Sequence, residues 1–374
     1  MTSASLVVQT SFLGDTVLTT PLIAELGARG AVDVVVTPAA AELLSNNPSI
    51  RQLFVYDKRG RDSGIAGLAR MARRVRTHFQ ELGDDHAAAA TLTAYLAQGS
   101  LRSATLAYLA GFGERVGFAT SPARALYTRR VPYDSGAHHA ERLWRLAVPA
   151  ARAAGTADSP ARGMPAPRLY PGQAERDAVD ALLGPAAGAR QLVALAPGSV
   201  WATKRWPYYS ELARRLAGRC RIAIVGSGAD SEVARLIVES AGAQGVVDAT
   251  GKLSLLASAE LIGRSELLVT NDSSPQHLAS AMATPTITIF GPTVPDFGFG
   301  PLTPHSITLG HPTLPCRPCH HHGPPTCPLG HWKCMKELGV EAVEIAVSRL
   351  LDAADARKQG AGAAAGERLR LTRE

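Results

Sequence analysis

The sequence predicts an α/β protein with two doubly wound parallel sheets. Short apolar runs alternate with helix-like segments in two series along the chain, and a stretch rich in Ala, Gly and Pro at residues 150–171 separates them. This alternation is typical of β-α-β units, whose parallel strands are buried on both faces. A chain of 374 residues is long enough for two domains of roughly 150 to 180 residues each. We therefore expect domains over residues 1–165 and 166–355, followed by a disordered tail at 356–374 that has little to bury.

Each series places its strands and helices in a regular order. In the first series a buried strand precedes a turn containing Asp15, and a helix then continues to Leu26. The expected strands are Leu6–Gln9, Val32–Thr37, Leu53–Tyr56, Leu192–Ala196, Ile222–Val225, Leu267–Thr270 and Thr286–Phe290. The other expected helices lie near residues 38–46, 173–183, 209–217, 232–241 and 276–283.

The charge of the chain favours anionic partners. Its formal net charge is +7 and its pI is near 9.3, which suits a nucleotide diphosphate, an anionic membrane surface or nucleic acid. The arginines are spread along helices, so a solvated basic surface is the simpler explanation. Charge alone does not distinguish among these partners. No apolar run reaches about 18 residues, and the N-terminus lacks the features of a secretory signal. We expect a cytoplasmic protein.

Three loops of the second series occupy positions where open α/β sheets bind ligands, at the carboxyl ends of strands. One contains Ser199 and Lys204, and a second is Gly226–Gly228, which lacks the full dinucleotide spacing and favours a plain tight turn. In the third, Asn271–Ser274, hydroxyls and N–H groups at a helix start can hold a diphosphate, although an ordinary helix cap explains the residues equally well.

Lys204 strengthens the diphosphate hypothesis. A cation facing a helix start would stabilise a leaving nucleotide diphosphate, as a metal ion does elsewhere. No Asp-x-Asp pair follows a strand to hold a divalent ion, and Trp201 and Trp206 flank the loop, which makes a simple solvated lysine less attractive.

Asp15 is the corresponding candidate in the first series. Gly14 and Asp15 follow the first strand directly, at a helix start and at the ligand edge of the sheet. The carboxylate could merely cap the helix, or it could remove a proton from an acceptor hydroxyl as a general base.

Four cysteines form the spacing Cys-x2-Cys-x7-Cys-x6-Cys, with four histidines among them. Thiolates at such spacing are candidate ligands for zinc or an iron–sulfur cluster, although the second pair is wider than a usual zinc knuckle. Disulfide formation or redox behaviour and simple packing of reduced thiols remain open alternatives. The four are Cys316, Cys319, Cys327 and Cys334.

These motifs together resemble glycosyltransferase family 9, the ADP-heptose:lipopolysaccharide heptosyltransferases, and most of all the heptosyltransferase II branch. The resemblance covers roughly residues 5–345, and the order of the motifs is more specific than any one of them. They are Phe12–Pro21, Gln98–Ser103, Arg115–Phe118, Ala196–Ser199, Lys204–Pro207, Thr250–Lys252, Thr270–Ser273, Phe290–Thr293 and Cys327–His331.

The resemblance implies the GT-B architecture and an inverting transfer that needs no metal. It implies that Asp15 is the general base, that Lys204 contacts the donor phosphates, and that Asp272 contacts the donor sugar. The remaining expected site residues are Ser199, Asp230, Ser273, Ser274 and His277 for the donor, and Gly14, Thr16, Ser100 and Arg102 for the acceptor.

The implied reaction moves heptose from ADP-heptose to the inner-core heptose of a lipid-linked Kdo/heptose acceptor. It requires no cofactor, and the implied partners include the anionic inner face of the inner membrane but no nucleic acid. One motif departs from the family pattern, because Ser274 stands where the family usually has Gly. Another nucleotide sugar as donor, a GT-B-like nucleotide-sugar epimerase, and a metal-binding interaction module built on the cysteines are the alternatives.

Overall fold

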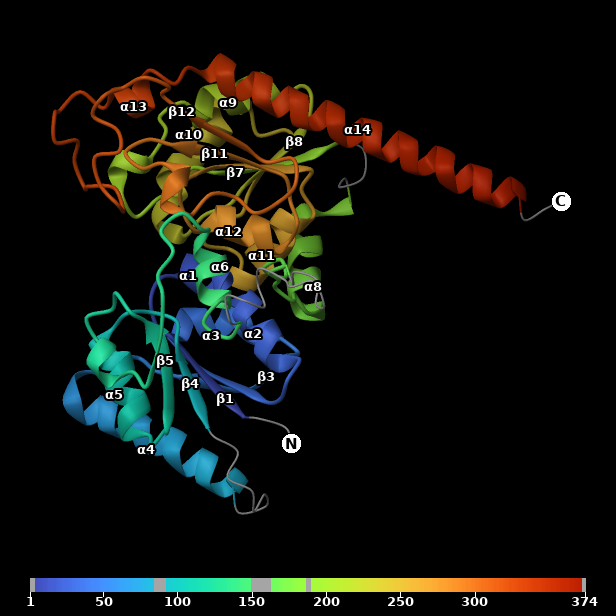
Figure 1. Cartoon of the computed structure of the whole chain (residues 1–374). Coiled ribbons are helices and arrows are strands. Elements are labelled where there is room, and N and C mark those ends of the chain that lie inside the picture. Colours follow the sequence, from blue (N-terminus) through green and yellow to red (C-terminus); the bar gives the residue numbers. More distant parts are fainter. Residues whose placement is uncertain (1–3, 84–91, 149–162, 186–189, 372–374) are drawn as a thin grey trace, which may run out of the picture. The chain divides into compact units, whose positions relative to one another are not determined.

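The computed structural model describes residues 4–83, 92–148, 163–185 and 190–371, with the side chains described as far as residue 359. The chain forms two compact units, Met1–Gly172 and Gln173–Glu374. Each unit contains one six-stranded sheet with every strand pair parallel (Figure 1). Most of the Ala-, Gly- and Pro-rich stretch expected as a linker, residues 150–162 of it, lies outside the described residues.

The first unit has the sheet order β3-β2-β1-β4-β5-β6. The chain reverses its direction of travel across the sheet between β1 and β4, and this switch point leaves a crevice beyond the strand ends in such folds. The strands are β1 (Ser5–Gln9), β2 (Val32–Val36), β3 (Ile50–Val55), β4 (Thr93–Leu96), β5 (Glu114–Phe118) and β6 (Arg129–Val131). The helices are α1 (Leu13–Leu18), α2 (Thr20–Gly27), α3 (Pro38–Leu44), α4 (Gly64–Gly83), α5 (Leu101–Leu109), η1 (Arg124–Leu126) and α6 (His139–Trp144).

The predicted helix through Leu26 is divided into α1 and α2, and Pro21 gives the reason. Proline has no N–H to donate to the carbonyl four residues earlier. The Thr20 hydroxyl donates to that Val17 carbonyl oxygen at 2.7 Å, and the Thr19 hydroxyl donates to the Asp15 carbonyl oxygen at 2.7 Å. The side chains thus satisfy carbonyls at the break, and Asp15 lies in the first turn of a separate short helix.

The second unit repeats the topology of the first, with the order β12-β11-β10-β7-β8-β9 and its switch point between β7 and β10. Its strands are β7 (Leu192–Ala196), β8 (Arg221–Ile224), β9 (Val246–Asp248), β10 (Leu267–Asn271), β11 (Thr286–Phe290) and β12 (Ile307–Gly310). Its helices are α8 (Gln173–Leu183), η3 (Ala202–Lys204), α9 (Tyr209–Leu216), η4 (Gly228–Asp230), α10 (Ser231–Ala241), α11 (Leu255–Gly263), α12 (Ser274–Ala281), η5 (Pro295–Phe297), α13 (Lys333–Lys336) and α14 (Val340–Leu371).

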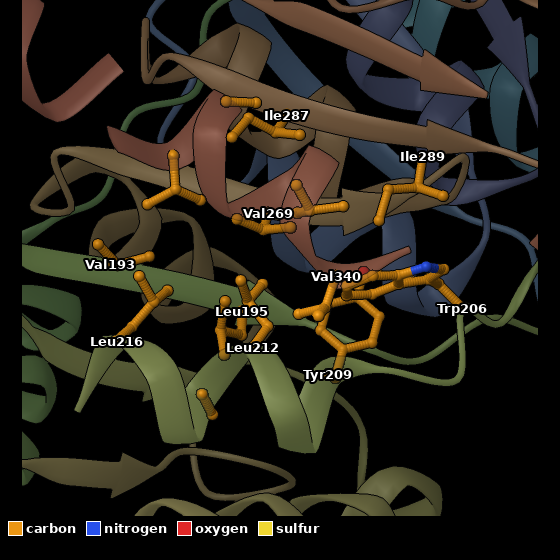
Figure 2. Close-up of a cluster of buried hydrophobic side chains, with 14 of the residues drawn as sticks. Val193, Leu195, Trp206, Tyr209, Leu212, Leu216, Val269, Ile287, Ile289 and Val340 are labelled. Carbon is orange, nitrogen blue, oxygen red and sulfur yellow. The ribbon is translucent and has the colours of Figure 1, made fainter. Parts of the chain in front are cut away.

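The core of the second unit lies between its sheet and helices α9, α10 and α14. Figure 2 shows apolar side chains of the central strands facing those of α9, with the rings of Trp206 and Tyr209 beside Val340. The Trp206 and Tyr209 ring centroids are 5.2 Å apart in an edge-to-face arrangement. Trp206 is therefore a core residue that anchors the end of the Lys204 loop, rather than a side chain facing a ligand.

The two-sheet α/β fold predicted from the sequence is confirmed. All seven predicted strands are present, each within a few residues of its expected bounds. Helix α14 runs on to Leu371, through most of the tail for which the composition predicted disorder. In the described part of the chain, no helix is both long and apolar enough to cross a membrane.

Candidate active site

Asp15 lies at the switch point of the first unit, in the first turn of α1 directly after β1. Its carboxylate accepts a short hydrogen bond from the Ser11 hydroxyl, and its side chain keeps 21% of its surface exposed. The backbone beneath it is fixed, because the Gln9 amide donates to the Thr19 hydroxyl at 3.0 Å. Asp15 is thus a positioned carboxylate that solvent or a substrate can reach.

His139, at the start of α6, is a neighbour of Asp15 that the sequence analysis missed. Its Nε2 lies 3.8 Å from Asp15 Oδ1, and its side chain is mostly buried. Burial lowers the pKa of His139 to about 4, although the Asp15 carboxylate acts in the opposite direction. The imidazole is therefore neutral at pH 7, so its charge does not neutralise the Asp15 carboxylate. The His138-His139 pair was visible in the sequence, but nothing there placed it beside β1.

The four expected acceptor residues have different environments. Thr16 is fully buried and its hydroxyl donates to the Phe12 carbonyl oxygen at 3.3 Å, so its side chain holds the helix rather than facing a ligand. Gly14 is buried in the same helix. Ser100 precedes α5, and Arg102 is exposed in its first turn.

Arg102 belongs to a group of cations that the sequence analysis did not identify. Its guanidinium lies 3.5 Å from the Lys58 carbonyl oxygen, and Lys58 Nζ donates to the Thr10 carbonyl oxygen at 2.5 Å, in the segment that leads to Asp15. Burial, with help from the Arg59 and Arg102 charges, lowers the pKa of Lys58. Like charges held this close favour an anionic ligand.

In the second unit, a buried ion pair joins the two loops at the switch point. Lys204 follows β7 and Asp272 follows β10, and Lys204 Nζ lies 2.6 Å from Asp272 Oδ2. Asp272 also accepts hydrogen bonds from the Thr293 hydroxyl at 2.7 Å and from the Gln276 amide at 2.9 Å. The lysine and the aspartate are only 7% and 8% exposed. The expected Lys204 cation is therefore present, held in one orientation by a carboxylate whose two oxygens are both bonded.

Asn271 holds both ends of the loop that contains Lys204. Its Nδ2 donates to the Pro197 carbonyl oxygen at 2.8 Å, and its Oδ1 accepts from the backbone N–H of Trp206 at 3.1 Å. Asn271 is fully buried, so an unbonded amide there would be costly. This positioning residue stood within a recognised motif, yet its partners became apparent only from the fold.

The remaining expected donor residues lie in helix α12 and in the segments that follow β7, β8 and β10. Ser273 precedes helix α12, and Ser274 is its first residue. Ser199 Oγ accepts from the Trp201 N–H at 3.2 Å, and His277 is buried in α12. Asp230 Oδ2 accepts from the N–H and hydroxyl of Ser227, at 2.9 and 2.8 Å, so its carboxylate caps η4.

The four clustered cysteines do not form a metal site in this structure. Among the described residues, no group of three or more His, Cys, Asp or Glu side chains is arranged to hold a metal ion. Cys334 packs in the core of the second unit, where burial raises its pKa to about 11. Cys316 Sγ and His331 Nε2 are 3.9 Å apart. All five cysteines of the chain, including Cys220, are free thiols.

A family model described as glycosyltransferase family 9 (heptosyltransferase) matches residues 76–332, more than half of the chain. The chain belongs to glycosyltransferase family 9.

Relatives of this family 9 chain include both a heptosyltransferase 1 and a heptosyltransferase 2. Lipooligosaccharide heptosyltransferase 2 of Campylobacter jejuni is 32% identical over 43% of this chain and 52% of its own length. The chain thus spans about half the length of that relative. Lipopolysaccharide heptosyltransferase 1 of Pseudomonas aeruginosa is 29% identical over 84% of this chain and 85% of its own length.

Solved structures of family 9 proteins share the fold. A glycosyltransferase family 9 protein from Veillonella parvula has a TM-score of 0.76 at 23% identity and covers 93% of this chain and 97% of its own. The E. coli ADP-heptose lipopolysaccharide heptosyltransferase II has a TM-score of 0.73 at 22% identity, covering 93% and 98%. The predicted GT-B fold class is confirmed by this likeness.

Proposed function

We propose that the protein is an inverting heptosyltransferase that moves heptose from ADP-heptose to the inner-core heptose of a lipid-linked Kdo/heptose acceptor, without a metal. The observation that carries this proposal is the buried Lys204–Asp272 pair beside the start of helix α12. A positive charge and a helix N-terminus at one switch point suit a nucleotide diphosphate. Membership of family 9 and the names of the relatives as heptosyltransferases support the choice of sugar.

In the proposed reaction, Asp15 takes the proton of the attacking acceptor hydroxyl. The hydroxyl oxygen forms a bond to the anomeric carbon while the bond from that carbon to the diphosphate breaks, and the electron pair leaves on ADP. A single displacement of this kind inverts the anomeric centre. Lys204 stabilises the negative charge that develops on the departing diphosphate. Asp272 holds Lys204 in place, since both of its oxygens are already bonded.

The acceptor of such an enzyme carries carboxylate groups, and the cations around Lys58 suit them. We propose that Lys58, Arg59 and Arg102 bind these anionic groups while the hydroxyl approaches Asp15. The exposed arginines of α4, together with Ile65, which is 87% exposed, would contact an anionic membrane surface at the cytoplasmic face.

A donor screen tests the proposal. The purified protein is incubated with a heptose-bearing lipid acceptor and ADP-heptose, or with other nucleotide sugars, and the acceptor is weighed by mass spectrometry. We expect one added heptose from ADP-heptose, undiminished by a chelator. Transfer from a different nucleotide sugar would replace the donor assignment, activity lost with the chelator would contradict the metal-independent step, and an isomerised donor without transfer would identify an epimerase instead.

A further inference from the structure

The cysteine-rich segment, residues 316–334, packs against the loop that carries Lys204. The Thr203 hydroxyl donates a short hydrogen bond to the Pro324 carbonyl oxygen. Gly323 has φ +88°, and a Cβ at this position would lie 3.1 Å from Lys204 Cε and 3.2 Å from Lys204 Cγ. The backbone of the segment thus covers the aliphatic stem of the lysine, and the positive φ and the close approach both favour glycine here.

Arg317 attaches the same segment to a second loop, the turn that follows β11. Its guanidinium donates to four backbone carbonyl oxygens, and Gly310 leaves the space for it, since a Cβ there would lie 2.7 Å from Arg317 Nη2. The acceptors are the carbonyls of Phe290 at 3.0 Å, Thr293 at 3.2 Å, Gly291 and His311. In addition, the Cys319 N–H donates to the Pro292 carbonyl oxygen at 3.0 Å.

The turn held by Arg317 ends at Thr293, which reaches the ion pair. Thr293 is 1% exposed, and its hydroxyl donates to the same Asp272 oxygen that pairs with Lys204. The cysteine-rich segment therefore contacts the pair from two sides, through the stem of Lys204 and through the turn that carries Thr293. None of these contacts involves a cysteine thiol.

We propose that Arg317 is a positioning residue for the donor site, which fixes the orientation of the Lys204 ammonium by way of Thr293 and Asp272. The inference rests on the proposed function, because it takes Lys204 to be the group that binds the donor diphosphate. Arginine suits this role because its planar fork of five N–H donors can bond several carbonyls in one fixed geometry. A lysine offers a single point of attachment and would leave some of these carbonyls unbonded.

The test combines two substitutions that act at successive points of the same path. Arg317→Met removes the fork, while Thr293→Val removes only the hydroxyl that bonds Asp272. We expect each variant to weaken ADP binding about tenfold, and to raise KM for the nucleotide sugar more than it lowers kcat. The double variant should bind ADP no more weakly than the single variant with the lower ADP affinity, because both changes act on one contact. Thr293→Ser, which keeps the hydroxyl, should restore ADP binding.

A second readout does not depend on any ligand. The rate at which an amine-reactive ester labels Lys204, followed by peptide mass spectrometry, should rise several-fold in Arg317→Met and Thr293→Val. Arg235→Met is the matched control, since it removes an exposed arginine paired with Glu232 and Glu239 on α10 of the same unit. We expect this control to change neither readout.

The outcomes separate the inference from the function on which it rests. Unchanged Lys204 labelling in Thr293→Val and Arg317→Met would overturn the positioning role, and so would additive losses of ADP affinity in the double variant. If Arg317→Met does not fold, Arg317→Lys, which keeps the charge but loses the planar fork, replaces it in both readouts. Increased labelling in a protein whose unaltered form binds no ADP would support the positioning role while contradicting the proposed donor.

Discussion

Two aspartates lie at equivalent edges of the two units, and their surroundings differ. The side chain of Asp272 is 10% exposed and accepts hydrogen bonds from Lys204, Gln276 and Thr293. Asp15 keeps 21% of its side chain exposed, accepts a hydrogen bond from Ser11, and lies beside a neutral histidine. A buried carboxylate that already accepts three hydrogen bonds is suited to holding its neighbours in place, whereas one that solvent can reach is available to accept a proton. We therefore predict different roles for the two aspartates, with Asp272 orienting Lys204 and Asp15 accepting the proton in the proposed reaction.

The largest effect should come from replacing the reachable carboxylate. In Asp15→Asn the shape is retained but the proton acceptor is lost, so we expect kcat to fall about a thousandfold. ADP affinity should not change, because the proposed partner of Asp15 is the acceptor hydroxyl and not the diphosphate. Steady-state kinetics and calorimetric titration with ADP provide the two measurements. Turnover within tenfold of the unaltered protein would remove Asp15 from the role of base.

Replacing Asp272 should instead lower the stability of the fold, and a second substitution at Lys204 should reverse part of that loss. Lys204→Met or Asp272→Asn alone leaves a buried charge without its partner, and each should lower the free energy of unfolding by about 3 kcal/mol. The double variant removes both charges, so its loss should be smaller than the sum of the two. ADP affinity should remain low in the double variant, since the cation is absent.

Denaturant unfolding and ADP titration test this prediction. The control is Lys358→Met, which removes an exposed pair with Glu266 and should cost less than about 1 kcal/mol. Additive losses in the double variant would mean that the buried pair is not an energetic unit. Recovered ADP binding in the double variant would mean that Lys204 does not hold the diphosphate.

His139 makes the region of Asp15 sensitive to acid. Its folded-state pKa of about 4 lies below the ordinary value of 6.5, so the unfolded chain binds a proton first as the pH falls. Stability is therefore complete above pH 6.5 and decreases towards pH 4, by about 1.4 kcal/mol for each pH unit. Between pH 7 and pH 5 this amounts to about 2 kcal/mol.

His139→Gln cannot be protonated in this range, so its stability should fall by about 2 kcal/mol less than that of the unaltered protein over the same two pH units. Urea unfolding at pH 7 and pH 5 measures the difference. His321→Gln replaces an exposed histidine and should behave like the unaltered protein. Equal acid sensitivity in His139→Gln and the unaltered protein would contradict the burial argument.

The contrast between the two aspartates also shows what the sequence could predict. Periodicity and the positions of strand ends were sufficient to place Asp15, Lys204 and Asp272 at the ligand edges of two sheets. They could not show that Asp272 accepts three hydrogen bonds, because one of its donors, Thr293, comes from another strand end, 21 residues further along the chain. His139 was missed for the same reason, since its approach to Asp15 depends on how α6 packs. Local patterns predict elements, whereas the number of donors around a carboxylate depends on long-range packing.

Substitution of Ser274 should have the smallest effect, and it tests whether the residue next to the Asp272 loop influences the donor site. It is the first residue of α12, and its backbone φ is not positive, so the conformation does not require the glycine usual in the family. None of the three donors to Asp272 comes from Ser274. We therefore expect Ser274→Gly to change ADP affinity less than threefold, measured by calorimetric titration, and stability by a few tenths of a kcal/mol. A tenfold gain in ADP affinity would show instead that the serine side chain crowds the diphosphate, and that the donor site differs from the family pattern at this residue.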